Sequence, residues 1–113
     1  MRMFKIASAG FLLTATALIP VSVVKAADVK AGRAKAQMMC MACHGLDGVA
    51  VLPGAANLSG QQAEYLSNQL KAYKSGRRAN PQMSVVASTL TEQDIENLSA
   101  WYAAIKVTVE MPD

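Results

Sequence analysis

The sequence predicts an all-α fold of three to five helices. Three stretches, 28–44, 59–76 and 91–105, combine a helix start signal with helix-forming or apolar residues at helical spacing. Residues 45–60 hold several glycines and a proline and follow no regular period, so we expect a loop there. We find no pair of segments that predicts a β-hairpin.

The chain is organised around the motif Cys40-Met41-Ala42-Cys43-His44. Two thiols three residues apart on one helical turn can both add to the vinyl groups of one haem, and the imidazole that follows can reach the iron. C-x-x-C-H is the signature of c-type haem attachment, and histidine is the usual proximal ligand. The motif therefore predicts one haem c per chain, bound covalently by Cys40 and Cys43, with His44 on the iron.

Other uses of the two cysteines agree less well with the sequence. A disulfide between them would close a very small loop and stabilise little. A thioredoxin-like redox pair needs a βαβ frame, of which the sequence shows no sign. A structural zinc site needs four Cys or His ligands, whereas this chain has two cysteines and one histidine.

Residues 1–26 are predicted to be a signal peptide, and residues 27–113 a single small domain. The leader starts with basic residues, continues through a largely apolar run and ends with small side chains that suit cleavage after Ala26. An uncleaved anchor is the alternative, but Pro20 and the polar residues weaken a membrane-spanning helix. We therefore expect export to the periplasm, with membrane contact only if the leader is retained.

The net charge of +3 belongs to the leader, because Arg2, Lys5 and Lys25 all lie in it. Without the leader, acidic and basic residues are equal in number, and the propionates of a haem would make the balance negative. A basic surface for nucleic acid is therefore not predicted. A domain of this size buries little apolar surface by itself, and a covalently held haem would supply a large apolar core.

The limits of the expected helices follow from their capping signals. Asp28 is expected to cap a first helix that runs to about His44. The S-x-x-Q pattern of residues 59–62 predicts a capping box for the second helix, and Gly76 ends it. Thr91 opens the last helix, which has acidic residues in its first turn. The apolar stripe of this helix consists of Ile95, Leu98, Trp101, Tyr102 and Ile105.

A sixth iron ligand must come from another residue type, because His44 is the only histidine. The methionines after the leader are Met38, Met39, Met41, Met83 and Met111. The first three lie too close to the attachment motif to reach the opposite face of the haem, and the last lies near an end that should fray. Met83, expected in a loop between helices, can supply the thioether. An iron with both axial positions filled favours electron transfer over chemistry at the metal.

Arg77 and Arg78 lie in the polar turn before Met83. They are candidates to contact a haem propionate or an acidic partner. A solvated pair of surface arginines is the alternative.

The chain resembles a class I cytochrome c, of the short bacterial mono-haem kind that also forms the halves of fused di-haem cytochromes. The residues that carry the resemblance are Gly32, Cys40 to Gly45, Asp47-Gly48, Asn57 to Gln61, Tyr65-Leu66, Gln69-Leu70, Tyr73 to Arg77, Met83, Leu90-Thr91 and Trp101-Tyr102. The resemblance implies the class I fold around one haem, with the first helix packed across the last near Gly32 and Trp101. The family usually has proline before Asn57, and its carbonyl accepts a hydrogen bond from the haem histidine. Here Ala56 occupies that position, and we expect its carbonyl to accept from His44.

The resemblance also implies a function. It indicates a periplasmic electron-transfer protein, not an enzyme, that exchanges electrons with redox proteins as a monomer. A haem subunit of a periplasmic dehydrogenase complex, for example one that oxidises sulfur compounds, is the alternative. A sensor or enzyme with an open iron site is a third reading, and Met83 argues against it.

Overall fold

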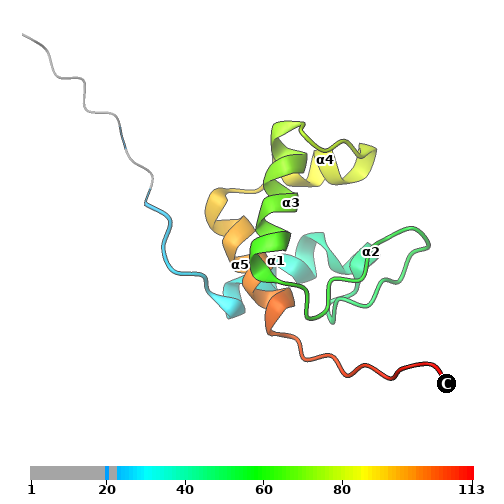
Figure 1. Cartoon of the computed structure of the whole chain (residues 1–113). Helices are drawn as coiled ribbons and strands as arrows, with labels where there is room; N and C mark the ends of the chain where they lie inside the picture. The colour runs from blue at the N-terminus through cyan, green and yellow to red at the C-terminus, as the bar shows by residue number, and fades with distance from the viewer. Residues whose placement is uncertain (1–19, 21–22) are drawn as a thin grey trace, which may run out of the picture.

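The computed structural model describes residue 20 and residues 23–113. These residues form five helices and no strand, which confirms the all-α prediction: α1 Val29–Met39, α2 Met41–His44, α3 Ala63–Ser75, α4 Pro81–Ser88 and α5 Glu92–Ala104 (Figure 1). The predicted leader lies largely outside the described residues. Within the described part of the chain, no helix has the length and apolar character needed to cross a membrane.

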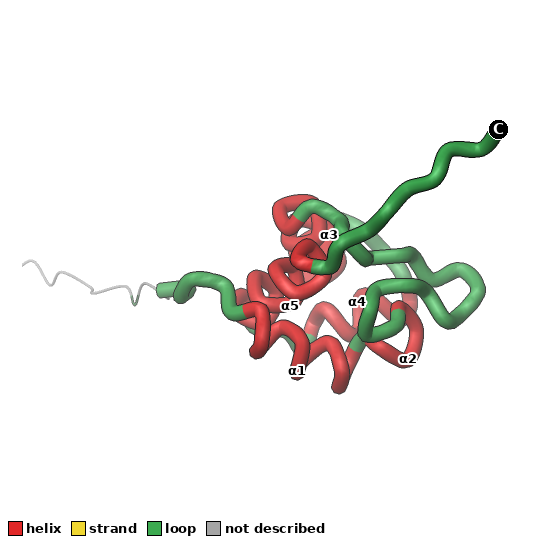
Figure 2. The backbone as a smooth tube through the Cα atoms, turned by 90° about the horizontal axis from the view of Figure 1, so that it is seen from below, coloured by secondary structure: helices red, strands yellow, loops and turns green. Residues whose placement is uncertain are grey.

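The first and last helices cross, and their contact is the most extensive between any two helices (Figure 2). Gly32 permits this crossing, because a Cβ at that position would lie 1.9 Å from the carbonyl oxygen of Asn97 and 3.0 Å from the Cβ of Trp101. The predicted packing near Gly32 and Trp101 is therefore confirmed. Asp28 caps α1 as expected, since its side chain accepts hydrogen bonds from two backbone N–H groups of the first turn.

The core lies where α1, α3 and α5 meet. It consists of Ala36, Leu66, Leu90, Ile95, Leu98 and Tyr102. Its three α5 members belong to the predicted apolar stripe, and Trp101 and Ile105, which complete that stripe, pack against the cluster while half-buried. Burying one face of each helix in this way supplies most of the stability that short helices lack alone.

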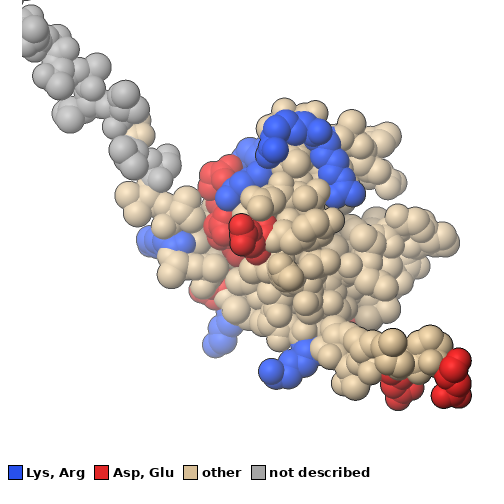
Figure 3. Space-filling model, viewed as in Figure 1, with Lys and Arg blue, Asp and Glu red and all other residues tan. Residues whose placement is uncertain are grey.

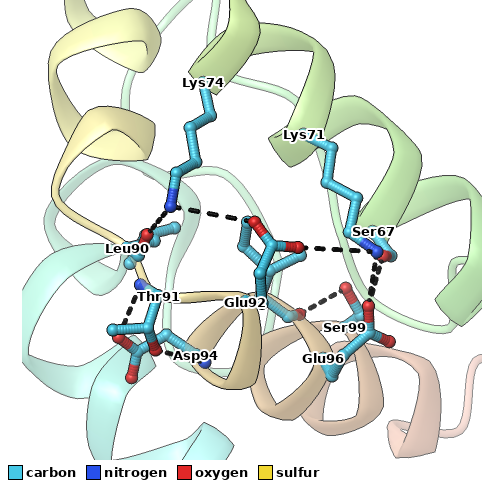
Figure 4. Close-up of polar contacts among 10 residues, drawn as sticks. Ser67, Lys71, Lys74, Leu90, Thr91, Glu92, Asp94, Glu96 and Ser99 are labelled. Atoms are coloured by element: carbon cyan, nitrogen blue, oxygen red, sulfur yellow. Dashed lines mark hydrogen bonds and ion pairs between the residues drawn. The ribbon is translucent and has the colours of Figure 1, made fainter. Parts of the chain in front are cut away.

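Ion pairs tie α5 to its neighbours from outside the core. The Lys35 ammonium of α1 lies 3.1 Å from the Asp94 carboxylate, and the Lys71 ammonium of α3 lies 2.7 Å from the Glu96 carboxylate (Figure 4). Thr91 and Asp94 form a reciprocal capping box at the start of α5. Thr91 therefore opens this helix as predicted.

The prediction that the first helix runs unbroken to about His44 was wrong. It ends at Met39, and Cys40 separates it from the short α2 with φ −114° and ψ −31°. Hydrogen bonds continue across the break, because the His44 N–H donates to the Cys40 carbonyl at 2.9 Å. Cys40 packs against the core at this point, and the bend lets both Cys40 and His44 line one pocket.

The predicted capping box before the second helix was also wrong. Gln62 is the N-cap residue of α3 and makes no side-chain capping bond. The Ser59 hydroxyl donates instead to the carbonyl of Asp47 at 2.7 Å, so Ser59 closes the 45–60 loop. Gly76 ends α3 with φ +79°, as expected for a left-handed C-terminal residue.

Met83 lies in a helix, not in the expected loop. α4 has Pro81 in its first turn, and the Asn80 side chain accepts hydrogen bonds from the N–H groups of Gln82 and Met83 at 3.0 and 2.9 Å. Asn followed by Pro is itself a helix start signal. Most residues of the 77–82 segment are polar, and this composition favoured the prediction of a turn over that of a helix start.

Candidate haem-binding site

A pocket opens between the C-x-x-C-H segment, the loop that follows it, α3, α4 and α5. It has about 900 Å³ of empty space, part of which is open to solvent. Its apolar walls include Leu58, Leu66, Leu70, Val86, Leu90 and Leu98. Apolar walls with a few polar groups suit a large, flat cofactor that has a polar edge. His44 and Met83 line the same pocket.

His44 is the last residue of α2, and its ring is hydrogen-bonded to the 45–60 loop. Nδ1 donates to the carbonyl oxygen of Ala56 at 2.7 Å, so the hydrogen bond expected from the resemblance is present. A proton on Nδ1 leaves the Nε2 lone pair free for a metal. Gly45 ends α2 with φ +73°, and a Cβ there would lie 2.4 Å from the carbonyl oxygen of Val49. Glycine is therefore required directly after His44.

Cys40 and Cys43 are free, half-buried thiols. The pKa of Cys40 is raised to about 11, mainly by burial and in addition by the nearby Cys43, while the Tyr102 hydroxyl acts in the opposite direction. In the chain without its cofactor, the Cys40 thiol is therefore neutral near pH 7. Cys40 lines the pocket, and Cys43 lies three residues further on, beside His44.

Met83 is half-buried and reaches the pocket from the first turn of α4. The Asn80 cap fixes that turn. The other methionines after the leader do not line this pocket: Met38 and Met111 are 78% and 82% exposed, Met39 packs against the core, and Met41 borders a separate groove. The fold therefore brings to one pocket the two side chains expected to ligate iron.

Arg78 lines the pocket, whereas Arg77 does not. Arg78 Nη1 donates to Gln69 Oε1 at 2.7 Å, and its guanidinium lies 4.7 Å from the centroid of the Tyr73 ring. Arg77 is exposed, and its Nε donates to Ser75 Oγ at 3.2 Å. Among the lining residues of this pocket in the described chain, Arg78 is the only Lys, Arg, Asp or Glu.

Sequence reasoning missed two features of the site. Gln69 was noted only as part of the family resemblance, although it borders the pocket and its side chain accepts a hydrogen bond from Arg78. Tyr102 was placed in the apolar stripe, but its hydroxyl donates to the carbonyl of Gly45 at 3.0 Å. A tyrosine on the buried face of a helix usually finds a partner for its hydroxyl, and that signal was available in the sequence.

The family model described as cytochrome c oxidase, cbb3-type, subunit III matches residues 27–101. Cytochrome c4 of Thiocapsa roseopersicina is 46% identical over 76 residues, which cover 67% of this chain and 39% of the relative. Cytochrome c-554(548) of Halomonas halodenitrificans is 39% identical, and the match covers 70% of this chain and 98% of the relative. The chain thus spans less than half the length of its cytochrome c4 relatives and nearly all of cytochrome c-554(548).

The fold agrees with these relationships. The crystal structure of reduced recombinant cytochrome c4 from Pseudomonas stutzeri is similar with a TM-score of 0.68 and 33% identity, over 78% of this chain and 50% of that one. The thiosulfate dehydrogenase electron acceptor of Stutzerimonas stutzeri is 33% identical over 75 residues, or 66% of this chain and 35% of the relative. A largely apolar pocket lined by Cys40 and His44 of the C-x-x-C-H motif fits haem c. The chain therefore belongs to the cytochrome c family, with the class I fold and haem c as its covalently attached cofactor.

Proposed function

We propose that this protein is a periplasmic mono-haem cytochrome c that carries electrons, with His44 and Met83 as the axial ligands of its iron. The observation that carries this proposal is that a single apolar pocket is lined by both side chains. The hydrogen bond between His44 and Ala56 supports it, because that bond leaves the other ring nitrogen free for a metal.

Haem c, when bound, supplies an iron that alternates between the ferrous and ferric states. Cys40 and Cys43 would hold it through thioether bonds. The Ala56 carbonyl keeps the His44 ring in one tautomer and makes it a better electron donor. The soft thioether of Met83 favours ferrous iron and raises the reduction potential.

Filling both axial positions with protein side chains supports a carrier over an enzyme or sensor. An oxygen, peroxide or carbon monoxide molecule would have to displace one of them. Electron exchange needs no such displacement, since it requires only a haem edge that partners can approach.

The surface near the pocket suits brief contacts with redox partners. Figure 3 shows basic side chains gathered over the end of α3 and, on this face, an uncharged surface over α4 and much of the 45–60 loop. Large apolar side chains are exposed there: Val49, Val51, Leu52 and Val85. An exposed apolar area is typical of a protein-binding surface. We propose that electron donors and acceptors of the periplasm dock on it.

A permanent haem subunit of a dehydrogenase is the second candidate function. It is favoured by the likeness to thiosulfate dehydrogenase electron acceptors. It is also favoured by the structure of thiosulfate dehydrogenase TsdBA from Marichromatium purpuratum, with a TM-score of 0.66 and 34% identity over 70% of this chain. Co-purification with one enzyme under all conditions would support this function, whereas a monomer that reduces several partners would support the free carrier.

The proposed ligation is tested by visible and far-red spectra of the exported protein beside Met83→Ala and the control Met41→Ala. We expect a weak sulfur-to-iron band in the parent and the control, and its loss in Met83→Ala. Ferrous Met83→Ala should bind carbon monoxide, and the parent should resist it. A parent without the band whose ferrous form binds carbon monoxide readily would contradict the carrier proposal and support an open iron site.

We also propose that residues 1–26 are removed as a signal peptide and that residues 27–113 form the mature domain. Mass spectrometry of the exported protein should give a chain that begins at Ala27. A membrane-bound protein of full length would show that the leader is an anchor.

A further inference from the structure

Two consecutive aromatic residues of α5 hold the turn that follows His44. Tyr102 donates its hydroxyl hydrogen to the Gly45 carbonyl at 3.0 Å, and Trp101 donates its indole Nε1–H to the Leu46 carbonyl, also at 3.0 Å. We call these two hydrogen bonds the aromatic latch. It joins residues more than fifty positions apart in the sequence.

The two bonds approach the turn from different directions. Neighbouring residues on an α-helix point about 100° apart, so Trp101 and Tyr102 cannot reach one point from the same side. Tyr102 is 2% exposed, and Gly45 is buried as well. Trp101 is half-buried, with the Arg33 guanidinium 5.8 Å from its ring centroid. Two fixed contacts from two sides restrict both the position and the orientation of the turn.

His44 needs such restraint because its helix is short. α2 has only four residues, and a helix of that length is not stable by itself. The His44 ring is held at one point by Ala56, and its backbone N–H is bonded to Cys40. The latch adds an attachment directly behind it, at Gly45. Tyr102 also lines the same pocket as Cys40, which lies at the other end of α2.

We propose that Trp101 and Tyr102 are positioning residues that fix the plane of the His44 imidazole at the iron. This inference rests on the proposed ligation by His44. With the latch intact, the ring has one orientation, so the iron has one electronic environment. Without it, α2 can rock about Cys40 and the ring can take up more than one orientation.

The test uses the haem-loaded protein and the variants Tyr102→Phe, Trp101→Phe and the double variant. Tyr102→Phe removes one hydroxyl and keeps the packing of the ring. Ser88→Ala is the matched control, because it also removes a hydroxyl that donates to a backbone carbonyl, that of Val85 at 2.7 Å, but Ser88 is exposed and does not line the pocket. The readouts are the low-spin ferric electron paramagnetic resonance spectrum, the number of hyperfine-shifted haem methyl signals in the nuclear magnetic resonance spectrum, and the far-red band.

We expect the parent and Ser88→Ala to give one sharp low-spin species and one set of methyl signals. The single latch variants should broaden or shift the low-spin signal, and the double variant should show a second set of methyl signals. The far-red band should persist in all of them, because Met83 is untouched. If the double variant loses haem, the single variant Tyr102→Phe decides the question, with the same expected broadening.

A single, unshifted species in both single variants would overturn the proposal, even if their thermal stability falls, because that result indicates packing alone. A parent that lacks the far-red band would instead show that the proposed His44 and Met83 ligation has failed. The two failures are therefore distinguishable.

Discussion

The Nδ1 of His44 lies 2.7 Å from the carbonyl oxygen of Ala56, and this bond draws the 45–60 loop against the attachment motif. Two further bonds brace the loop: the Ala50 N–H donates to Asn57 Oδ1 at 2.8 Å, and the Leu58 N–H donates to the Gly48 carbonyl at 2.7 Å. The acceptor for His44 is a main-chain oxygen, so no side-chain substitution removes it. Substitutions at position 56 change only how rigidly the oxygen is held.

We predict that Ala56→Pro stabilises the protein and Ala56→Gly destabilises it. Proline keeps the carbonyl and restricts the unfolded chain, which should raise the free energy of unfolding by about 0.4–1 kcal/mol, and glycine should lower it by a similar amount. Denaturant unfolding of the haem-loaded variants measures both. A destabilising Ala56→Pro would show that proline cannot adopt the backbone conformation of this loop.

Gly32→Ala should be among the most damaging single substitutions. A methyl group there would lie 1.9 Å from the Asn97 carbonyl oxygen, and backbone cannot move aside as a flexible side chain can. The helices α1 and α5 would have to separate, at a cost of about 1–3 kcal/mol or more, although alanine is the better helix former. Ala31→Ser, on an exposed position of the same turn, is the control and should stay within about 0.5 kcal/mol of the parent.

Two carboxylates on α5 make stability depend on pH in the acid range. The Lys71 ammonium and the Ser67 hydroxyl lower the pKa of Glu96 below its usual 4.5, against the effect of burial. Burial by itself would raise the pKa of Asp94, but hydrogen bonds from Thr91 and Lys35 outweigh it and lower the pKa below 3.8. Both groups contribute stability above their unfolded pKa values, and that stability is lost as the pH falls through the folded values.

We therefore predict that the free energy of unfolding decreases between about pH 5 and pH 3. These side chains are partly exposed, so each pair should contribute no more than about 1 kcal/mol. Glu96→Gln should be less stable than the parent near pH 7 and should show a flatter acid profile. Glu110→Gln, in the exposed tail, should leave the profile unchanged. Equal profiles for the parent and Glu96→Gln would contradict the assignment.

Features that depend on local chemistry were predictable from the sequence. Caps such as Asp28, Thr91 and Gly76 act within a few residues of themselves, and the α5 stripe follows from helical periodicity. The prediction at Ser59 was wrong because its hydroxyl can bond either to the backbone at the start of α3 or to a carbonyl elsewhere in the loop. The folded loop brings the Asp47 carbonyl near, and the hydroxyl donates to that carbonyl.

The contacts that join distant segments could not be read from local patterns. The hydrogen bonds of Trp101 and Tyr102 join α5 to the turn after His44. No spacing rule relates these positions, because the α1–α5 crossing places them together. The His44 bond to Ala56 was expected only because a family resemblance supplied the pairing. The different positions of Arg77 and Arg78 likewise depend on how α3 ends. Arg78 lines the pocket, whereas Arg77 lies away from it.

The different positions of Arg77 and Arg78 predict that the two residues affect the reduction potential differently. Arg78→Gln should lower the reduction potential, whereas Arg77→Gln should leave it nearly unchanged. A positive charge at the pocket disfavours ferric iron, so its removal favours oxidation. Because Arg78 is exposed and screened by water, the shift should be on the order of 20–60 mV, where 59 mV is a tenfold change for one electron. Redox titrations at low and high salt measure it, and the difference should shrink at high salt. Equal shifts in both variants would mean that only net charge matters and that Arg78 has no special place beside the cofactor.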